Sequence, residues 1–248
     1  MDLKIQMLGT GSAFAKMFNN NNAVLKVNDR ALLVDCGITA PKALYDLGYN
    51  FNALDAVLIT HIHGDHVGGL EEYAFQMKYV YGRKPVLYIA DTLAEPLWEH
   101  TLKGGLQQYE SETLDDFFEV RPLSEGYTHE LFPGLNVQLI STKHIPNKPN
   151  YSLLFNDYFF YSGDTIFNPD LLCSLVNDRG VRVIFHDCQL HPPGTVHACL
   201  PQLLTLPAAV QERLYLMHYG DNQPDFVGST GMMRFVEQHR NYDIDQLK

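Results

Sequence analysis

The stretch Val57–Gly69 reads VLITHIHGDHVGG, and it places three histidines and one aspartate within six positions directly after an apolar run. His61 and His63 lie two positions apart, so in an extended segment their side chains point to the same side. A glycine then permits a sharp turn, and Asp65 and His66 follow before a helical pattern begins. Neutral imidazoles together with a carboxylate are the donors that Zn²⁺ prefers where it keeps an open position. The pattern therefore predicts a strand that ends in a metal site rather than four ordinary turn residues.

Three further candidate ligands follow apolar runs later in the chain. His144 follows VQLISTK, Asp164 lies in FFYSGDT, and His218 follows RLYLM. A single histidine or aspartate after a strand is more often a structural residue. Loops gathered at one edge of a sheet are, however, the usual way in which an α/β fold builds an active site. We therefore expect the three side chains to complete the site that begins at His61.

Short apolar runs alternate with turns and with helical periodicity over the whole chain, and the runs are rich in β-branched or aromatic residues. Strands are expected at 4–8, 23–27, 31–35, 56–60, 85–89, 136–140, 151–155, 158–162, 181–185 and 213–217. Helices are expected at 40–48, 67–81, 91–103, 168–178, 199–204 and 229–239. The alternation favours an α/β protein with mixed sheets covered by helices. No break in composition divides the chain, so residues 1–248 are expected to form a single domain.

The composition excludes several classes of protein. A net charge of −11 argues against a broad grip on nucleic-acid phosphates, which normally needs a basic face, but it allows a small anionic substrate held by metal ions. The N-terminal residues MDLKIQMLGTGS do not resemble a signal peptide, and no apolar run approaches the length of a membrane span. The four cysteines are scattered without a C-x-x-C pair, which favours reduced thiols. We expect a cytoplasmic protein with no membrane partner and no stable nucleic-acid complex.

The run THIHGDH, the later single histidine, the SGDT aspartate and the final histidine after a strand together resemble the metallo-β-lactamase superfamily. This resemblance implies an αββα sandwich, two mixed β-sheets flanked by helices, with two divalent metal ions. Carried over by motif, the first ion would be held by His61, His63 and His144, and the second by Asp65, His66 and His218, with Asp164 bridging both. The donor set suits Zn²⁺, and Mn²⁺ tolerates the same donors.

Within this superfamily, MLGTGSA, LLVDCG, HIHGDHVGG and YSGDT are most similar to the ribonuclease Z group of phosphodiesterases. That group pairs an acidic residue after a later strand with a histidine that opens a helix, and here Asp187 and His197 match. A carboxylate that orients an imidazole allows it to donate a proton to a leaving alkoxide. The implied mechanism uses a hydroxide that Asp65 orients and a proton from His197, which Asp187 holds. The neighbouring His186 and His191 match no role and are interpreted as structural.

His144 and Asp164 are only 20 positions apart, which leaves room for two short strands and their turns. Enzymes of the ribonuclease Z group that process transfer RNA insert their long RNA-gripping arm in this interval, so precursor tRNA is disfavoured as a substrate. The stretches GTGSAFAKMFNNNNA, TKHIPNKPNYSLLFND and VIFHDCQLHPPGTVHACLPQLLTLP resemble the anti-Pycsar proteins of phages and bacteria. That resemblance implies a homodimeric hydrolase that converts 3′,5′-cyclic mononucleotides into 5′-nucleotides, tolerates several bases, and counteracts antiphage signalling in the host cytoplasm.

Residues outside the ligand set carry weaker expectations. Asp35 follows a strand and is either a hydrogen-bond partner of a metal-binding imidazole or a turn residue. Phe14, Phe18 and the asparagines at 19–22 form a candidate loop for holding the base, because aromatic faces stack on any base. Tyr73 and Phe75 fit a helix face in the core. The segment 104–120 is either a lid over the site or a dimer contact.

Three alternatives to the cyclic-nucleotide phosphodiesterase stay open. A ribonuclease Z-like endonuclease that processes tRNA 3′ ends would use the same metal site and would bind tRNA with a steep salt dependence. A non-catalytic sponge would bind a nucleotide without cleaving it, and would need neither seven metal ligands nor a proton donor. A thioester or lactone hydrolase shares the metal motif, but the pair of Asp187 and His197 disfavours it.

Overall fold

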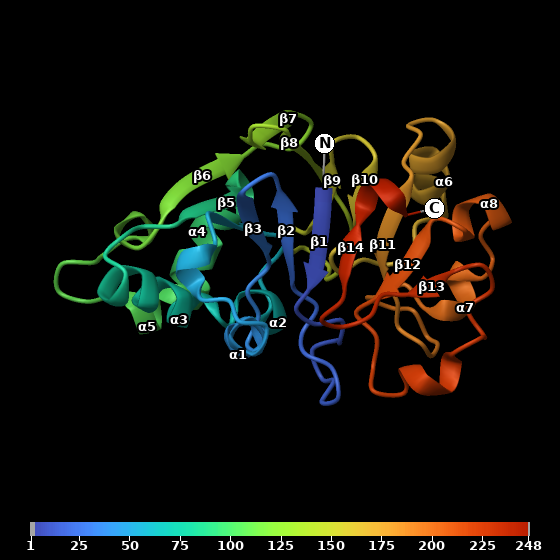
Figure 1. Cartoon of the computed structure of the whole chain (residues 1–248), viewed down its shortest axis with the longest axis horizontal. Coiled ribbons are helices and arrows are strands. Elements are labelled where there is room, and N and C mark those ends of the chain that lie inside the picture. Colours follow the sequence, from blue (N-terminus) through green and yellow to red (C-terminus); the bar gives the residue numbers. More distant parts are fainter. Residues whose placement is uncertain (1–2, 248) are drawn as a thin grey trace.

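The computed structural model describes residues 3–247, and fourteen strands in this part of the chain form two sheets of seven strands each (Figure 1). The first sheet contains, in spatial order, β14 (Asn241–Asp243), β1 (Leu3–Met7), β2 (Ala23–Val27), β3 (Arg30–Val34), β4 (Ala56–Ile59), β5 (Val86–Ala90) and β6 (Glu119–Leu123). The second contains β13 (Arg234–Phe235), β12 (Leu214–Met217), β11 (Val183–Asp187), β10 (Phe159–Tyr161), β9 (Tyr151–Phe155), β8 (Leu135–Ser141) and β7 (Thr128–Phe132). Both sheets are mixed: neighbours from β3 to β6 and from β10 to β13 are parallel, and the others are antiparallel.

Short helices cover the outer faces of the two sheets. The helices are α1 (Ala40–Asp46), α2 (Gly64–Val67), α3 (Leu70–Phe75), α4 (Asp91–Leu97), α5 (Lys103–Leu106), α6 (Pro169–Asn177), α7 (Leu200–Leu203) and α8 (Ala208–Gln211). Two of them continue as π-helical turns, α3 over Gln76–Val80 and α4 over Trp98–Leu102. Buried leucines of α6 and α7 pack with the outer face of the second sheet, whereas α1, α3 and α4 contribute to the larger core of the first sheet.

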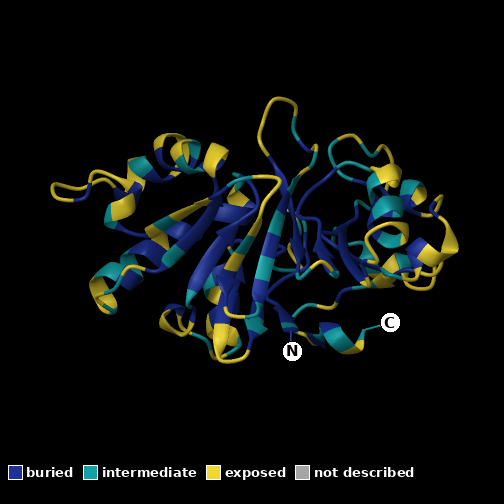
Figure 2. Cartoon of the chain, turned by 90° about the horizontal axis from the view of Figure 1, so that it is seen from above, coloured by how far each residue is buried: buried dark blue, intermediate teal, exposed yellow. Residues whose placement is uncertain are grey.

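The larger core contains apolar side chains from both sheets, which therefore pack face to face. Figure 2 shows the strands largely buried, with the exposed positions concentrated in helices and loops. Tyr73 lies in this core as predicted, and Phe75 packs against it while partly buried. All four cysteines are free thiols, as their spacing predicted. The result is the predicted αββα sandwich.

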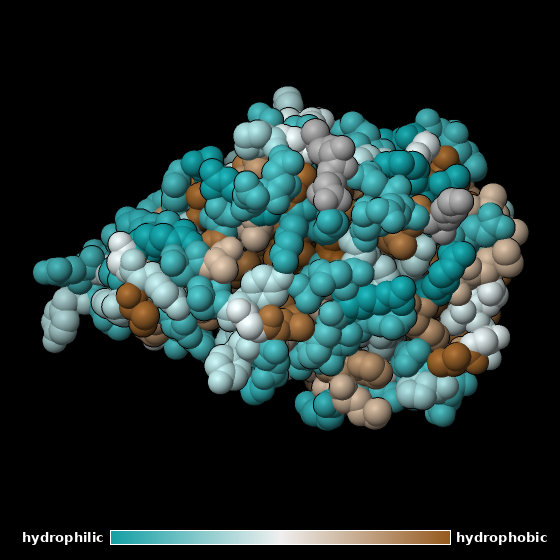
Figure 3. All heavy atoms as spheres, viewed as in Figure 1, coloured by the Kyte–Doolittle hydropathy of each residue, from teal (hydrophilic) through white to brown (hydrophobic). Residues whose placement is uncertain are grey.

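One face of the molecule shows how polar and apolar residues are distributed on the surface. The face drawn in Figure 3 is largely hydrophilic, with apolar residues in small separate groups. Within residues 3–247, the helices are too short or too polar to cross a bilayer.

The predicted helix at 229–239 is wrong. Gly231 adopts a φ of +63°, and the chain then extends so that β13 pairs in parallel with β12. Met233 and Val236 are both buried, and their spacing of three positions imitates helical periodicity. Val236 donates its backbone N–H to the carbonyl of Leu216 at 2.9 Å, so a sheet contact satisfies this segment where a helix was expected.

The polar residues singled out in the sequence follow strands whose carboxyl ends meet at one edge of the sandwich. In the second sheet, β10, β11 and β12 are parallel, and β8 runs in the same direction because β9 is antiparallel to both β8 and β10. The loops after β8, β10 and β12 carry His144, Asp164 and His218. The loop after β4 in the first sheet carries His61 and His63. Ligand-bearing loops from both sheets therefore meet at this edge.

Candidate metal centre

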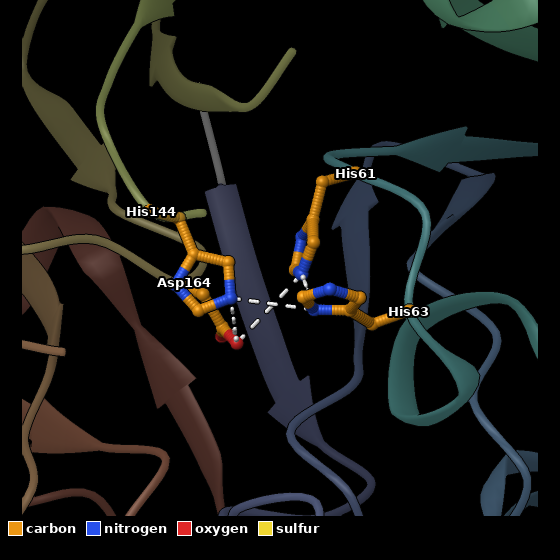
Figure 4. A group of neighbouring side chains, drawn as sticks. All are labelled: His61, His63, His144 and Asp164. Atoms are coloured by element: carbon orange, nitrogen blue, oxygen red, sulfur yellow. Dashed lines mark hydrogen bonds and ion pairs between the residues drawn. The ribbon is translucent and has the colours of Figure 1, made fainter. Parts of the chain in front are cut away.

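Three histidines and one aspartate form a first group of donor atoms (Figure 4). Nε2 of His61 and Nε2 of His144 lie 3.0 Å and 3.3 Å from Nδ1 of His63. Oδ2 of Asp164 lies 3.7 Å from the same nitrogens of His61 and His144. His63 is partly exposed and the other three side chains are buried, so the group lies at the bottom of an opening.

A second group of four donors adjoins the first and shares Asp164 with it. Nε2 of His66 lies 3.3 Å from Oδ2 of Asp65 and 3.2 Å from Oδ1 of Asp164. Nε2 of His218 lies 3.2 Å and 3.3 Å from the same two oxygens. Asp164 thus turns Oδ2 toward the first group and Oδ1 toward the second, which is the arrangement of a bridging carboxylate. All seven residues that the motifs singled out are brought together.

The spacing of these donors fits a pair of metal ions. Four ligands about 2.0 Å from a tetrahedral zinc ion stand about 3.3 Å from one another, and the separations given above range from 3.0 to 3.7 Å. Nε2 of His66 and Oδ1 of Asp164 are buried, and although they lie 3.2 Å apart they make no hydrogen bond with each other or with another described residue. Buried polar atoms are normally satisfied, so unpaired atoms in a set of nitrogen and oxygen donors indicate a site built for cations.

Asp35 links a histidine of the first group, His61, to a histidine of the second, His66. Its Oδ2 accepts a hydrogen bond from Nδ1 of His66 at 2.8 Å and another from Oγ1 of Thr60 at 2.8 Å. Thr60 Oγ1 lies 3.1 Å from Nδ1 of His61 and, because its own hydrogen goes to Asp35, accepts a hydrogen bond from that ring N–H. Asp35 is fully buried with a φ of +59°, a strained conformation for a non-glycine residue. Asp35 is therefore a partner of metal-site imidazoles, one of the two roles considered above.

Two further oxygen atoms orient the remaining buried imidazoles. Nδ1 of His144 donates to the carbonyl of Val196 at 2.7 Å, and Nδ1 of His218 lies 3.3 Å from Oδ1 of Asp187. Nδ1 is thus the nitrogen of each ring that faces a protein oxygen, and Nε2 is the nitrogen that the neutral ring offers to a metal ion. The contact with the Val196 carbonyl was not predicted, since a backbone atom 52 positions away leaves no sequence signal.

The two groups differ in charge. Burial lowers the pKa of His61, His63 and His144 below the ordinary histidine value, so these rings are neutral donors. Burial acts the same way on His218, but the charges of Asp164 and Asp187 outweigh it and raise the pKa of His218 to about 10. Without a cation, protons on the imidazole rings therefore balance the negative charge of the carboxylates in the second group. A metal ion that binds there must displace these protons.

Asp187 and His197, which the sequence predicts as a carboxylate and a proton donor, are in contact beside the second group. Nδ1 of His197 donates to Oδ2 of Asp187 at 2.7 Å, and the same oxygen accepts the backbone N–H of Thr165 at 2.9 Å. Burial alone would lower the pKa of His197, but the adjacent charge and hydrogen bond of Asp187 raise it. Asp187 also contacts His218 through its other oxygen, so one carboxylate orients both a metal-site histidine and the proposed proton donor.

A cavity of about 630 Å³ opens over the two groups, and the side chains of Asp65, Asp164, His197 and His218 line it. His191, which the sequence left without a role, lies on its wall with Asn222, and the two side chains are 2.5 Å apart. His186 is structural as predicted, because it is buried and its Nδ1 donates to the carbonyl of Asp187 at 2.7 Å.

The loop at 14–22 differs from the expectation for a base-holding loop. Phe14 is 88% exposed at the rim of the cavity, whereas Phe18 packs edge-on against Tyr219. Asn21 and Asn22 are fully buried: Asn21 donates to the hydroxyl of Tyr161, and Asn22 accepts the backbone N–H of Gly37. Asn20 is also buried and bonds Thr39. These three asparagines shape the backbone beneath the site and cannot reach a ligand, so the prediction is wrong for them.

The segment 104–120 does not cover the site of its own chain. Residues 107–112 form the loop that projects at the left end of Figure 1, and they line neither the large cavity nor the smaller one beside it. Tyr109 at its tip is fully exposed. Of the two interpretations of this segment, a lid or a dimer contact, the position of the loop favours the dimer contact.

Two mixed sheets with helices on both sides and His/Asp donors at their common edge define a protein of the metallo-β-lactamase fold. The metallo-β-lactamase fold protein YhfI from Bacillus subtilis matches the structure with a TM-score of 0.75, covering 98% of this chain and 99% of that one. The two sequences are 17% identical, so this likeness concerns the fold.

Sequence comparison identifies the family, within this fold, to which the chain belongs. The family model described as "Anti-Pycsar protein Apyc1" matches residues 3–242. The anti-Pycsar protein Apyc1 of Paenibacillus harenae is 61% identical over 242 residues, covering 98% of this chain and all of that protein. The protein of the same name from Paenibacillus sp. (strain J14) is 56% identical over 245 residues with the same coverage. The chain belongs to the anti-Pycsar protein Apyc1 family, which confirms the resemblance drawn from its motifs.

Proposed function

We propose that the protein is a metal-dependent phosphodiesterase that hydrolyses 3′,5′-cyclic mononucleotides to 5′-nucleotides and thereby counteracts antiphage signalling. The observation that carries this proposal is the meeting of three features at one cavity: two donor groups, the Asp164 carboxylate between them, and the Asp187–His197 pair. Membership of the anti-Pycsar protein Apyc1 family supports the same activity.

His61, His63 and His144 would hold one divalent cation, Asp65, His66 and His218 a second, and Asp164 would bind both. We propose Zn²⁺ for both positions because imidazole nitrogens and carboxylate oxygens suit it, with Mn²⁺ as the alternative. When bound, such a pair of cations lowers the pKa of a water molecule and neutralises charge that develops on phosphate oxygens.

The protein side chains would supply the remaining steps, which are orientation of the water and donation of a proton. Asp65 faces the cavity and would orient the attacking water toward phosphorus. His197 would donate its proton to the leaving 3′-oxygen, while Asp187 holds the ring through Nδ1 and stabilises its protonated form. Attack breaks the bond from phosphorus to the 3′-oxygen, and the phosphate stays on the 5′-oxygen, so a 5′-nucleotide results.

The chain lacks features that a tRNA-processing endonuclease would use. A loop and the strands β9 and β10 fill the interval between His144 and Asp164, which leaves no space for an RNA-gripping arm there. The net charge of −11 also disfavours a long polyanion. A nucleotide sponge would not need a proton donor held by a buried carboxylate, and a thioester hydrolase would not need to protonate an alkoxide at the position of His197.

A substrate panel tests the proposal. Purified protein is incubated with cyclic mononucleotides, cyclic dinucleotides and precursor tRNA, with and without a chelator, and the products are separated by chromatography. We expect the cyclic mononucleotides to be converted into 5′-nucleotides, and the chelator to stop the reaction because both donor groups require cations. Intact cyclic mononucleotides beside cleaved precursor tRNA would contradict the proposal, and binding without turnover would indicate a sponge.

We further propose that residues 1–248 act as one domain in the cytoplasm and that two copies form a homodimer. The projecting loop at 107–112, with its exposed Tyr109, is the contact we propose. Sedimentation equilibrium should give twice the mass of the chain, and Tyr109→Ala should shift it toward the single-chain mass. A wild-type protein that sediments as one chain would exclude the dimer.

A further inference from the structure

A second, smaller cavity adjoins the candidate metal centre. It has a volume of about 190 Å³ and lies between helix α4 with its π-helical continuation and the loop that joins β8 to β9. His63, His144 and Ile145 line both this cavity and the larger one, so the two meet at the first donor group. A molecule anchored at the metal centre can therefore extend into the smaller cavity.

Apolar side chains form opposite walls of this smaller cavity. Leu93 and Pro96 come from α4, three positions apart and therefore on one face of the helix. Ile145 and Pro149 come from the opposite loop. Two apolar walls in a small cavity favour a compact apolar body, and a few polar groups then set its orientation.

Asn150 also lines this cavity, and its side chain is fixed by hydrogen bonds to the protein. The residue is 2% exposed, and its Nδ2 donates to Oγ1 of Thr142 at 2.9 Å and to the carbonyl of Asp164 at 2.8 Å. A ligand in the cavity therefore meets mainly the apolar walls.

We infer that the smaller cavity holds the base of the cyclic nucleotide between its apolar walls. This inference rests on the proposed function, which brings the phosphate to the adjoining donor groups. Apolar walls pack against the planar ring of any common base, so the cavity accepts several bases. Lys148 adds a cation to the lining, which favours a nucleotide over a neutral ligand.

Narrowing the cavity tests the inference. Leu93→Phe adds ring volume at the wall, and its effect is measured with cyclic AMP and with 1-O-methylribose 3′,5′-cyclic phosphate, which has no base. The ratio of kcat/KM for cyclic AMP to that for the base-free phosphate should fall about tenfold, the usual loss when an apolar pocket rejects a group.

Surface variants guard against a folding defect in Leu93→Phe. His100 is exposed and lines the same cavity, so His100→Trp narrows the opening without placing a larger side chain in the core. It should also lower the ratio of kcat/KM for cyclic AMP to that for the base-free phosphate. Glu95→Trp lies on the same helix outside the cavity and should leave the ratio unchanged. An unchanged ratio in both Leu93→Phe and His100→Trp would overturn the inference. So would a fall seen only in Phe14→Ala, which would place the base at the rim of the larger cavity.

A binding measurement separates this inference from the proposed function. Calorimetry with the hydrolysis-resistant phosphorothioate analogue of cyclic AMP should show about tenfold weaker binding to Leu93→Phe than to the wild type. If the wild type cleaves neither cyclic AMP nor the base-free phosphate, the proposed function fails, and this binding difference still decides the inference. Equal binding to both proteins would reject the base cavity.

Discussion

Asp164→Ala should abolish hydrolysis of cyclic nucleotides, lowering kcat by roughly three orders of magnitude or more, and should reduce the bound metal. The reason is geometric, because one oxygen of Asp164 lies among the donors of the first group and the other among those of the second. Its loss removes a ligand from both positions at once. Turnover is measured by chromatography, and metal content by mass spectrometry of the purified protein.

Asp29→Ala provides a matched control for this experiment. Asp29 is exposed in the turn between β2 and β3, and its replacement removes the same side chain far from the donor groups. Activity and metal content should both stay at the wild-type level. If Asp164→Ala itself kept full activity and a full complement of metal, the bridging position would be ruled out.

His197→Ala should lower kcat by about two to four orders of magnitude, the range typical of a lost general acid, while the metal content stays intact. His197 contacts Asp187, which lies between it and the donor His218. Its ring nitrogen lies within 4.8 Å of donor atoms of Asp164, Asp187 and His218, but the two groups assigned to the cations each have four donors without it. The measurement combines kcat for cyclic AMP with metal analysis of the same sample.

The leaving group distinguishes proton donation from a structural effect. A p-nitrophenyl phosphodiester expels an anion that needs no proton, so His197→Ala should lose far less activity on it than on cyclic AMP. Equal losses on both substrates would argue against proton donation. A variant that lost metal would instead place His197 among the ligands.

The sequence predicted the inner strands of both sheets and missed the outer ones. Each inner strand is covered on both faces, so it reads as a continuous apolar run, and all ten such runs are strands. The four strands that were missed are β6, β7, β13 and β14, and each lies at the edge of its sheet. Edge strands expose part of their surface, so residues such as Glu119 and Arg121 of β6 interrupt the pattern.

The candidate site was predictable where its chemistry is carried by side chains in short motifs. His61, Asp65 and their neighbours lie within one turn, and a resemblance to known motifs supplied their distant partners. Contacts that depend on the path of the backbone gave no such signal. Asn22 is an example, because its fully buried side chain binds the backbone at Gly37 and Asp65, although its sequence context indicates an open polar loop. The smaller cavity left no sequence signal either, because it forms only where helix α4 packs opposite the loop that joins β8 to β9.

The donor atoms come from both halves of the sandwich. Asp65, in helix α2 after β4 of the first sheet, and His218, after β12 of the second, contact each other although 153 positions separate them in the chain. A cation held by both acts as a reversible cross-link between the halves, and its binding free energy adds to the stability of the folded chain. The supply of metal in the cell would then determine how long the protein survives as well as how fast it works.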